Sequence, residues 1–217
     1  VIDLPLIEYV ASTNKPMIIS TGMANEEEIE EAIEAARSGG CSELAILHCV
    51  SGYPAPAEDY NLKTISHMRD KFGLVIGLSD HTLDNNTAIA SVALGASIIE
   101  KHFTLDRKGG GPDDSFSLEP SEMAELCKGA NVAWSALGDI NFSRKSSEEA
   151  NVQFRRSLYF VKDMKSGDII SEDAVRSVRP GFGIPPKYLK DIIGQKIKHD
   201  VLKNTPVKNQ SLEKPII

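Results

Sequence analysis

The chain has 217 residues, of which 41% are hydrophobic and 25% are charged, and its formal net charge is −7. This is the composition of a globular protein with room for one large domain or for one medium and one small domain. The acidic balance and the lack of a basic cluster argue against nucleic-acid binding, and no run of about 18 apolar residues predicts a membrane span.

Three cysteines, Cys41, Cys49 and Cys127, lie in apolar contexts at spacings that fit no zinc or redox motif. We interpret them as small core residues of a protein in the reducing cytoplasm. The first ten residues, VIDLPLIEYV, contain no basic segment and no Met. We therefore expect them to lie inside a longer protein and not to form a signal peptide.

Four short apolar runs recur at regular intervals, and each is followed by an amphipathic pattern typical of a helix. The first helix has the clearest ends, because Asn25 and Glu28 form a capping-box signature and Gly39 stops the pattern. Alternating strands and helices predict βα units in a parallel sheet. Four units are either half of an eight-stranded barrel or a small open sheet. The runs cover 17–19, 44–47, 74–76 and 97–99, and the later helices are expected near 62–72, 84–93 and 121–137.

The second part of the chain has a different character. Residues 1–140 carry the βα units, and residues 141–152 are polar and are interpreted as a linker. Residues 153–217 contain short strand-like pieces broken by Gly and Pro, which indicate a small β-rich domain. A domain of roughly 65 residues has a core that is only marginally stable, so we expect it to pack against the surface of a partner.

Polar side chains collect where the predicted strands end, which is where parallel α/β folds bind ligands. In the stretch GLSDHT, Ser79 and His81 share a face and Asp80 faces away, which argues against a Ser-His-Asp relay. His81 and His102 end consecutive strands, and two imidazoles with carboxylate oxygens suit Mn²⁺ or Zn²⁺. Spacing alone also leaves open that both histidines are hydrogen-bonded core or rim residues.

Two further features lie at the same edge. His48 follows the second strand and is interpreted as a structural residue. The stretch DRKGGGPDD, residues 106–114, follows the fourth strand and is either a flexible surface loop or a loop that covers the substrate.

Six motifs occur in order along the chain: KPMIISTGMA, HCVSGYPAP, IGLSDHT, GASIIEKHFTLDR, GGPDDSFSLEP and RSVRPGFGIPPKYL. Together they closely resemble the sialic acid synthase family, and the resemblance covers essentially the whole chain. It implies an enzyme that condenses phosphoenolpyruvate with an N-acylated amino-hexose to form a nine-carbon acidic sugar and phosphate. It also implies the C-terminal half of a TIM barrel followed by a small antifreeze-like domain, also called a SAF or β-clip domain. The first half, with further catalytic residues, is expected outside this chain.

The resemblance also assigns roles to individual residues. It implies that His81 and His102 bind the catalytic Mn²⁺ and that Asp113 handles the acceptor sugar beside the metal. It implies a domain-swapped homodimer in which Arg179 reaches the active site of the partner subunit. The positions that match substrate contacts of the family are Lys15, Ser20, Tyr53, Ser79, Phe154 and Arg179.

Single positions within these motifs bear on which acceptor sugar the enzyme uses. N-acetylneuraminate synthases carry Asn two residues before the Tyr, where this chain has Ser51. Other motifs are more similar to the pseudaminic acid synthase branch, and N-acetylneuraminate and legionaminic acid synthases are the alternatives. A different alternative is a non-catalytic fragment that binds carbohydrate or ice, although the tail has one Thr, Thr205. Because half a barrel exposes two sheet edges, we expect the isolated chain to be inactive.

Overall fold

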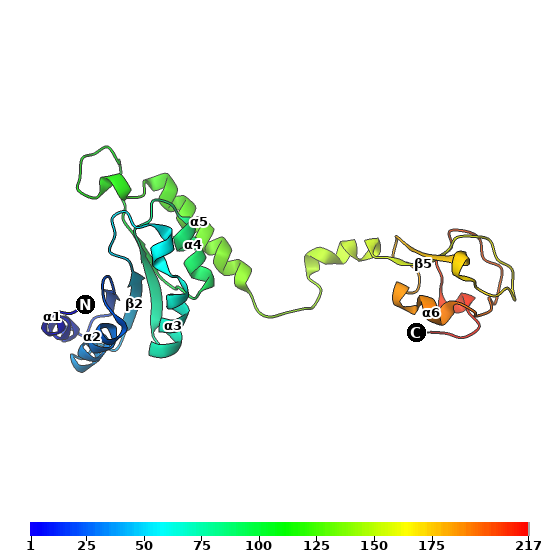
Figure 1. Cartoon of the computed structure of the whole chain (residues 1–217), viewed down its shortest axis with the longest axis horizontal. Helices are drawn as coiled ribbons and strands as arrows, with labels where there is room; N and C mark the ends of the chain where they lie inside the picture. Colours follow the sequence, from blue (N-terminus) through cyan, green and yellow to red (C-terminus); the bar gives the residue numbers. More distant parts are fainter. Residues whose placement is uncertain (217) are drawn as a thin grey trace. The chain divides into compact units, whose positions relative to one another are not determined.

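The structure, a computed structural model, describes residues 1–216. The chain divides into two compact units, Val1–Asp139 and Ile140–Ile217. Figure 1 follows the chain through both units from blue to red. Within residues 1–216, no helix is long and apolar enough to cross a membrane.

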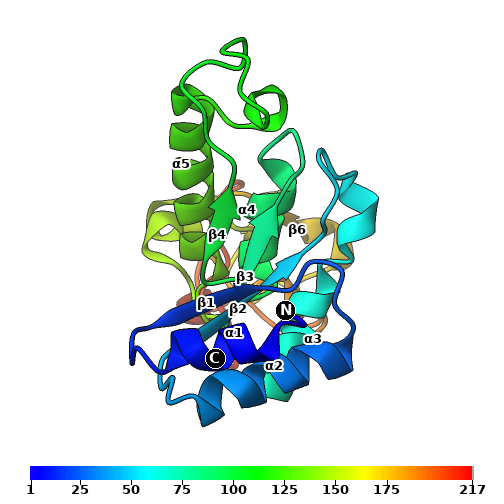
Figure 2. The same ribbon diagram turned by 90° about the vertical axis from the view of Figure 1, so that its left-hand side faces the viewer.

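A four-stranded parallel sheet forms the centre of the first unit, with the strand order β1-β2-β3-β4. Each strand is followed by a helix, which confirms the predicted βα repeat. In Figure 2, the arrows of β3 and β4 point toward the same end of the unit, where the loop before α5 lies. The strands are β1 (Met17–Ser20), β2 (Leu44–Cys49), β3 (Val75–Asp80) and β4 (Ile99–Lys101), and the helices are α1 (Leu4–Ala11), α2 (Glu26–Ser38), α3 (Lys63–Phe72), α4 (Asn86–Ala93) and α5 (Pro120–Leu137), with short 3₁₀ helices η1 (Ala57–Tyr60) and η2 (Asp114–Phe116).

The ends of α2 follow directly from its sequence. The Asn25 side chain accepts the Glu28 N–H at 2.9 Å, and the Glu28 carboxylate accepts the Asn25 N–H at 2.8 Å. Gly39 is the C-cap, as predicted. Helix α1 was not predicted; Asp3 caps it by accepting the Leu6 N–H at 3.2 Å.

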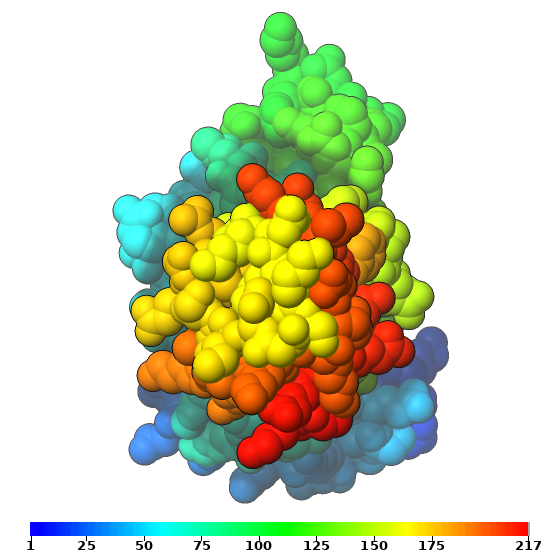
Figure 3. All heavy atoms as spheres, turned by 90° about the vertical axis from the view of Figure 1, so that its right-hand side faces the viewer, coloured from blue at the N-terminus to red at the C-terminus, as the bar shows by residue number. Residues whose placement is uncertain are grey.

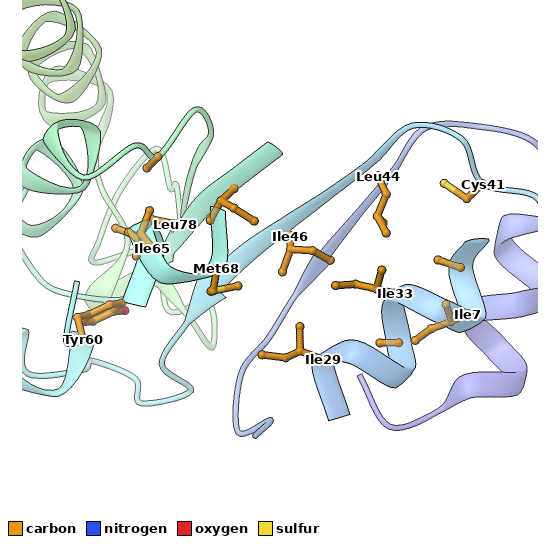
Figure 4. Packing of buried hydrophobic residues seen from close by; sticks show 14 of the residues in the cluster. Ile7, Ile29, Ile33, Cys41, Leu44, Ile46, Tyr60, Ile65, Met68 and Leu78 are labelled. Carbon is orange, nitrogen blue, oxygen red and sulfur yellow. The ribbon is translucent and has the colours of Figure 1, made fainter. Parts of the chain in front are cut away.

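Alternate residues of the central strands face the helices and form the core (Figure 4). Ile46, Ile76 and Leu78 are at most 1% exposed, and Ile65 and Met68 of α3 belong to the same cluster. Because neighbours on a strand point to opposite sides, the intervening residues, such as Ser79, face away from this core. The packing of one face therefore fixes which side chains the other face presents.

The sheet is strongly curled around that second face. The Ser20 hydroxyl of β1 donates to the Glu100 carboxylate of β4 at 3.3 Å, although two strands separate β1 from β4. In a flat sheet, strands three positions apart would lie roughly 14 Å from each other. The side chains on this face therefore converge, as they do inside a barrel.

The second unit is built around a short antiparallel pair, β5 (Ser157–Phe160) and β6 (Val175–Val178). Isolated bridges join Tyr159 to Pro206 and Met164 to Val201. Figure 3 shows the yellow segment near residue 160 beside the orange and red segments. Leu158, Phe160 and other apolar residues form a separate core. The remaining elements are η3 (Ser146–Phe154), which lies largely in the expected linker, and η4 (Glu172–Ala174), η5 (Pro186–Tyr188), α6 (Leu189–Ile192) and η6 (Asn209–Ser211).

Candidate active site

A hollow of about 230 Å³ lies at the carboxyl ends of β3 and β4. Both strands end there with polar residues, so their side chains meet at one edge of the sheet, as the sequence predicted. Ser79 and His81 come from β3 and the residue after it, and Glu100 and His102 come from β4 in the same way. The hollow is lined by Ser79, His81, Glu100, Lys101 and His102.

Two histidines and two aromatic residues form a compact cluster at this hollow. The ring centroids of His81 and His102 lie 5.2 Å apart. The Tyr53 ring lies 4.3 Å from that of His81, and the Phe116 ring lies 5.1 Å from that of His102. These aromatic rings restrict the directions in which the imidazoles can turn.

The hydrogen bonds of His81 leave one ring nitrogen available. Its Nδ1 lies 2.7 Å from the backbone carbonyl of Val50. A carbonyl oxygen only accepts, so Nδ1 carries the proton and the lone pair is on Nε2. The main chain is held as well, because the His81 N–H donates to the Tyr60 hydroxyl at 2.6 Å and the His81 carbonyl accepts the Ala55 N–H at 3.0 Å.

The loop after β4 brings a carboxylate to the second histidine. Asp113 Oδ2 lies 3.5 Å from His102 Nδ1, and the Asp113 side chain is 58% exposed. The adjacent Asp114 instead closes its own loop by accepting the Gly111 N–H at 2.7 Å. The Thr104 hydroxyl and then the Gly111 N–H lower the pKa of Asp114. Of these two neighbouring acids, Asp113 is therefore the one placed at the histidines.

Glu100 is a candidate that sequence reasoning did not select. Its Oε1 accepts the Ser79 hydroxyl at 2.7 Å and the Ser20 hydroxyl at 3.3 Å. The contact with Ser20 joins strands that are not neighbours, so it depends on the curl of the sheet. The only sequence signal was its position two residues before His102, on the same face of the strand.

Asp80 faces away from this hollow, as strand alternation predicted. Its side chain is 0% exposed and pairs with the ammonium group of Lys101 at 2.9 Å. The Lys101 side chain is only 1% exposed. Neither charge therefore faces a ligand in the hollow.

The histidines suit a divalent transition metal. Neutral imidazole nitrogen is a common ligand for such ions, and His81 Nε2 has the required lone pair. A backbone carbonyl is one of the common partners of the opposite ring nitrogen in metal-binding histidines, beside carboxylates and water. Among residues 1–216, no three His, Cys, Asp or Glu side chains are grouped to hold a metal. The pair can therefore supply part of a coordination shell, which substrate or water oxygens would complete.

Other predicted residues lie elsewhere. Lys15 precedes β1, near Cys41, whose thiol lies 3.9 Å from the Lys15 carbonyl. This is the amino end of the strand, and the substrate contact expected for Lys15 stays a prediction. Phe154 and Arg179 belong to the second unit.

His48 also lies outside the cluster. Its Nε2 donates to the Tyr60 carbonyl at 2.6 Å, a structural contact of the kind that the sequence analysis expected. Within the second unit, the Gly181 N–H donates to the Gln153 carbonyl at 2.8 Å, which brings the segments that carry Phe154 and Arg179 together. Both of these side chains are exposed.

Comparisons with known families match both units. Residues 1–142 match the model of the NeuB family, and residues 155–213 match that of the SAF domain. The fold is therefore α/β, with a curled parallel half-barrel sheet followed by a SAF domain, as the sequence analysis expected.

Three relatives illustrate the range of similar proteins. A pseudaminic acid synthase of Campylobacter jejuni is 40% identical over 92% of this chain and 58% of its own length. An N,N'-diacetyllegionaminic acid synthase of the same species is 41% identical over 89% of this chain and 59% of its own length. The crystal structure of an N-acetylneuraminic acid synthetase from Leptospira borgpetersenii is 35% identical, with a TM-score of 0.63 over 69% of this chain and 52% of that one. The chain thus spans a little more than half the length of these proteins.

Proposed function

Because the chain belongs to the NeuB family, we propose that the protein it forms part of condenses phosphoenolpyruvate with an N-acylated amino-hexose. The products are a nine-carbon sialic acid-type sugar and phosphate. The observation that carries this proposal is the pair formed by His81 and His102, with ring centroids 5.2 Å apart and Asp113 beside it. Relatives that match most of this chain are synthases of such sugars, which supports an enzyme.

The proposed reaction forms one carbon–carbon bond and breaks one carbon–oxygen bond. C3 of phosphoenolpyruvate attacks the aldehyde carbon of the open-chain sugar, and the aldehyde oxygen takes up a proton. Water adds at C2 and loses a proton, and phosphate then leaves with the oxygen that joined it to C2. The enzyme has to align two substrates and move protons at defined atoms, tasks that fixed side chains perform well.

His81 and His102 would hold a divalent metal such as Mn²⁺ through their Nε2 atoms. When bound, such an ion acts as a Lewis acid on a carbonyl oxygen. Tyr53 and Phe116 pack against the two imidazoles and keep their orientation. Asp113 would accept a hydrogen bond from a hydroxyl group of the acceptor and so fix its position beside the histidines.

Glu100 and Ser79 would act on the phosphoenolpyruvate side of the hollow. The Ser79 hydroxyl is held by the Glu100 carboxylate at 2.7 Å and can be redirected toward an oxygen of the substrate. The carboxylate itself repels the phosphate, so its role would be to accept or deliver a proton. The positive charge that binds the phosphate would come from outside this hollow, since the Lys101 ammonium pairs with Asp80.

For the acceptor, we propose a 2,4-diacetamido-2,4,6-trideoxyhexose, which would make the protein a pseudaminic acid synthase. Ser51, in the stretch HCVSGYPAP, supports this choice over N-acetylmannosamine. The relatives named for pseudaminic and legionaminic acid are about equally similar, so stereochemistry within the diacetamido sugars rests on the motifs alone. Arg179 and Phe154, both exposed, would contact the acyl-amino group from the partner subunit of a homodimer.

The test is phosphate release by the full-length protein from phosphoenolpyruvate and Mn²⁺ with one acceptor at a time. The acceptors are N-acetylmannosamine and the isomeric diacetamido-trideoxyhexoses, each with and without EDTA. We expect release that EDTA abolishes and that one diacetamido sugar supports best. Release with N-acetylmannosamine alone would overturn the acceptor assignment, and no release from folded protein with any sugar would overturn the reaction.

A further inference from the structure

We propose that Asp80 and Lys101 are positioning residues that set the geometry of the two metal-binding histidines. Each immediately precedes one of the histidines in the chain, and the two form an ion pair on the other side of the sheet. This inference rests on the proposed role of His81 and His102 in binding a metal. Neither charged residue would touch metal or substrate.

The ion pair is buried and fully hydrogen-bonded. The Lys101 ammonium donates to Asp80 Oδ2 at 2.9 Å and to the carbonyls of Thr82 and Asp84 at 2.6 and 2.8 Å. These three acceptors use its three protons. Asp80 Oδ1 accepts the Thr82 N–H at 2.9 Å. Lys101 thus ties the end of β4 both to β3 and to the loop that leaves β3.

The pair occupies the last position at which β3 and β4 are in register. Asp80 lies opposite Lys101 in the ladder, after Ser79 opposite Glu100, and both strands end there. The histidines come one residue later, where no ladder hydrogen bonds between β3 and β4 hold them. In the described sheet β4 pairs only with β3, and the ion pair links the two strands at the residues next to the histidines.

The remaining contacts hold each histidine separately. The His81 main chain is bound by Tyr60 and Ala55, and the His102 carbonyl accepts the Leu118 N–H at 2.9 Å. None of these contacts joins the two histidine segments to each other. The Tyr53 ring packs against both imidazoles, and the Ser79–Glu100 hydrogen bond joins the two strands two residues before the histidines. The Asp80–Lys101 pair joins the strands at the residues directly before the histidines, and we therefore assign the spacing of their main chains to it.

Stability alone is a weak reason for such a pair, because a buried ion pair often contributes little more than apolar residues of similar size. Removing one partner is different, since it leaves an uncompensated buried charge. A variant that lacks only one of the two charges therefore loses stability as well as positioning, and a weaker metal affinity could come from either effect. A variant without either charge separates them, because it removes the link and leaves no charge unpaired.

The experiment compares four forms of the full-length protein with the wild type after treatment with EDTA and dialysis. They carry Lys101→Met, Asp80→Asn, both substitutions together, or Lys63→Met as a control at an exposed lysine of α3. Mn²⁺ affinity is measured from the electron paramagnetic resonance signal of free Mn²⁺, and stability is measured by urea unfolding.

We expect the Lys101→Met and double variants to bind Mn²⁺ about tenfold or more weakly than wild type, the range seen for residues that orient metal ligands. The double variant should recover stability relative to Lys101→Met without recovering affinity. Wild-type affinity in the double variant would overturn the positioning role while leaving the metal site in place. Failure of the wild type to bind Mn²⁺ would overturn the proposed metal site, and this inference with it. If Lys101→Met does not fold, the comparison of Mn²⁺ affinity between the double variant and the wild type tests the positioning role.

Discussion

Removing the Tyr60 hydroxyl tests whether this group holds the main chain of His81 in place. Tyr60 is 0% exposed, and its hydroxyl accepts the His81 N–H at 2.6 Å and lies 3.5 Å from the Ser79 carbonyl. The substitution Tyr60→Phe removes that oxygen and keeps the ring that fills the core. The His81 N–H, in a residue that is 6% exposed, is then left without its acceptor.

The loss in the free energy of unfolding follows from these contacts. A buried donor that loses its partner costs about 1–3 kcal/mol, and the long contact with Ser79 adds little. We expect a loss of about 2 kcal/mol in the free energy of unfolding, measured by urea denaturation of full-length, metal-free protein at pH 7. A loss below about 0.5 kcal/mol, the usual range for surface substitutions, would refute the view that this hydroxyl holds the His81 main chain.

The same hydroxyl predicts a pH dependence. Burial raises the pKa of Tyr60 above its ordinary value of 10.0, because the phenolate would lose its solvation. Above that ordinary value the unfolded chain releases the proton while the folded chain keeps it. The stability that the hydroxyl contributes is therefore complete below pH 10 and falls as the pH rises further, by about 1.4 kcal/mol per pH unit. The difference in stability between wild type and Tyr60→Phe should shrink above this pH, and a constant difference would contradict the assignment.

Three further predictions concern the site and the fold. His102→Ala should abolish both Mn²⁺ binding and phosphate release, whereas His67→Ala, which removes an exposed imidazole that pairs with Glu26, should leave both unchanged; normal binding by His102→Ala would exclude it as a ligand. Glu100→Gln should lower kcat by about 10²–10⁴ in steady-state assays with little effect on Mn²⁺ affinity, because it removes a proton acceptor and keeps the shape; an unchanged kcat would remove Glu100 from proton transfer. Asn25→Ala should destabilise the protein by about 1 kcal/mol in urea denaturation, because α2 loses its cap; an unchanged midpoint would contradict the capping box.

The sequence predicted those parts of the fold that depend on local rules. The capping box of Asn25 and Glu28 and the stop at Gly39 are local signals, and the structure has both. Helix α1 was missed because most of its eight residues are apolar, so the sequence does not show which side is buried; in the structure Ile7 and Ala11 are buried while Leu6, Tyr9 and Val10 are exposed. Its cap at Asp3 is visible in the sequence only when the helix is already known.

The candidate site was predictable where strand alternation and chain order determine it. Alternation placed Ser79 and His81 on one face and Asp80 on the other, and the structure agrees. The role of Glu100 was not predictable, because its contact with Ser20 depends on how strongly the sheet curls, a property of the packed core. Lys15 was selected by resemblance; it precedes β1, and its contact with a substrate stays a prediction.

An isotope measurement distinguishes the proposed condensation from simple hydrolysis of phosphoenolpyruvate. The full-length protein is given phosphoenolpyruvate labelled with ¹⁸O at the oxygen between C2 and phosphorus, together with Mn²⁺ and the preferred acceptor. For the proposed condensation, we expect the label to leave with phosphate and a nine-carbon acid to appear in equal amount by mass spectrometry. Label retained in pyruvate, with unlabelled phosphate and no nine-carbon acid, would show simple hydrolysis at phosphorus and would exclude the condensation.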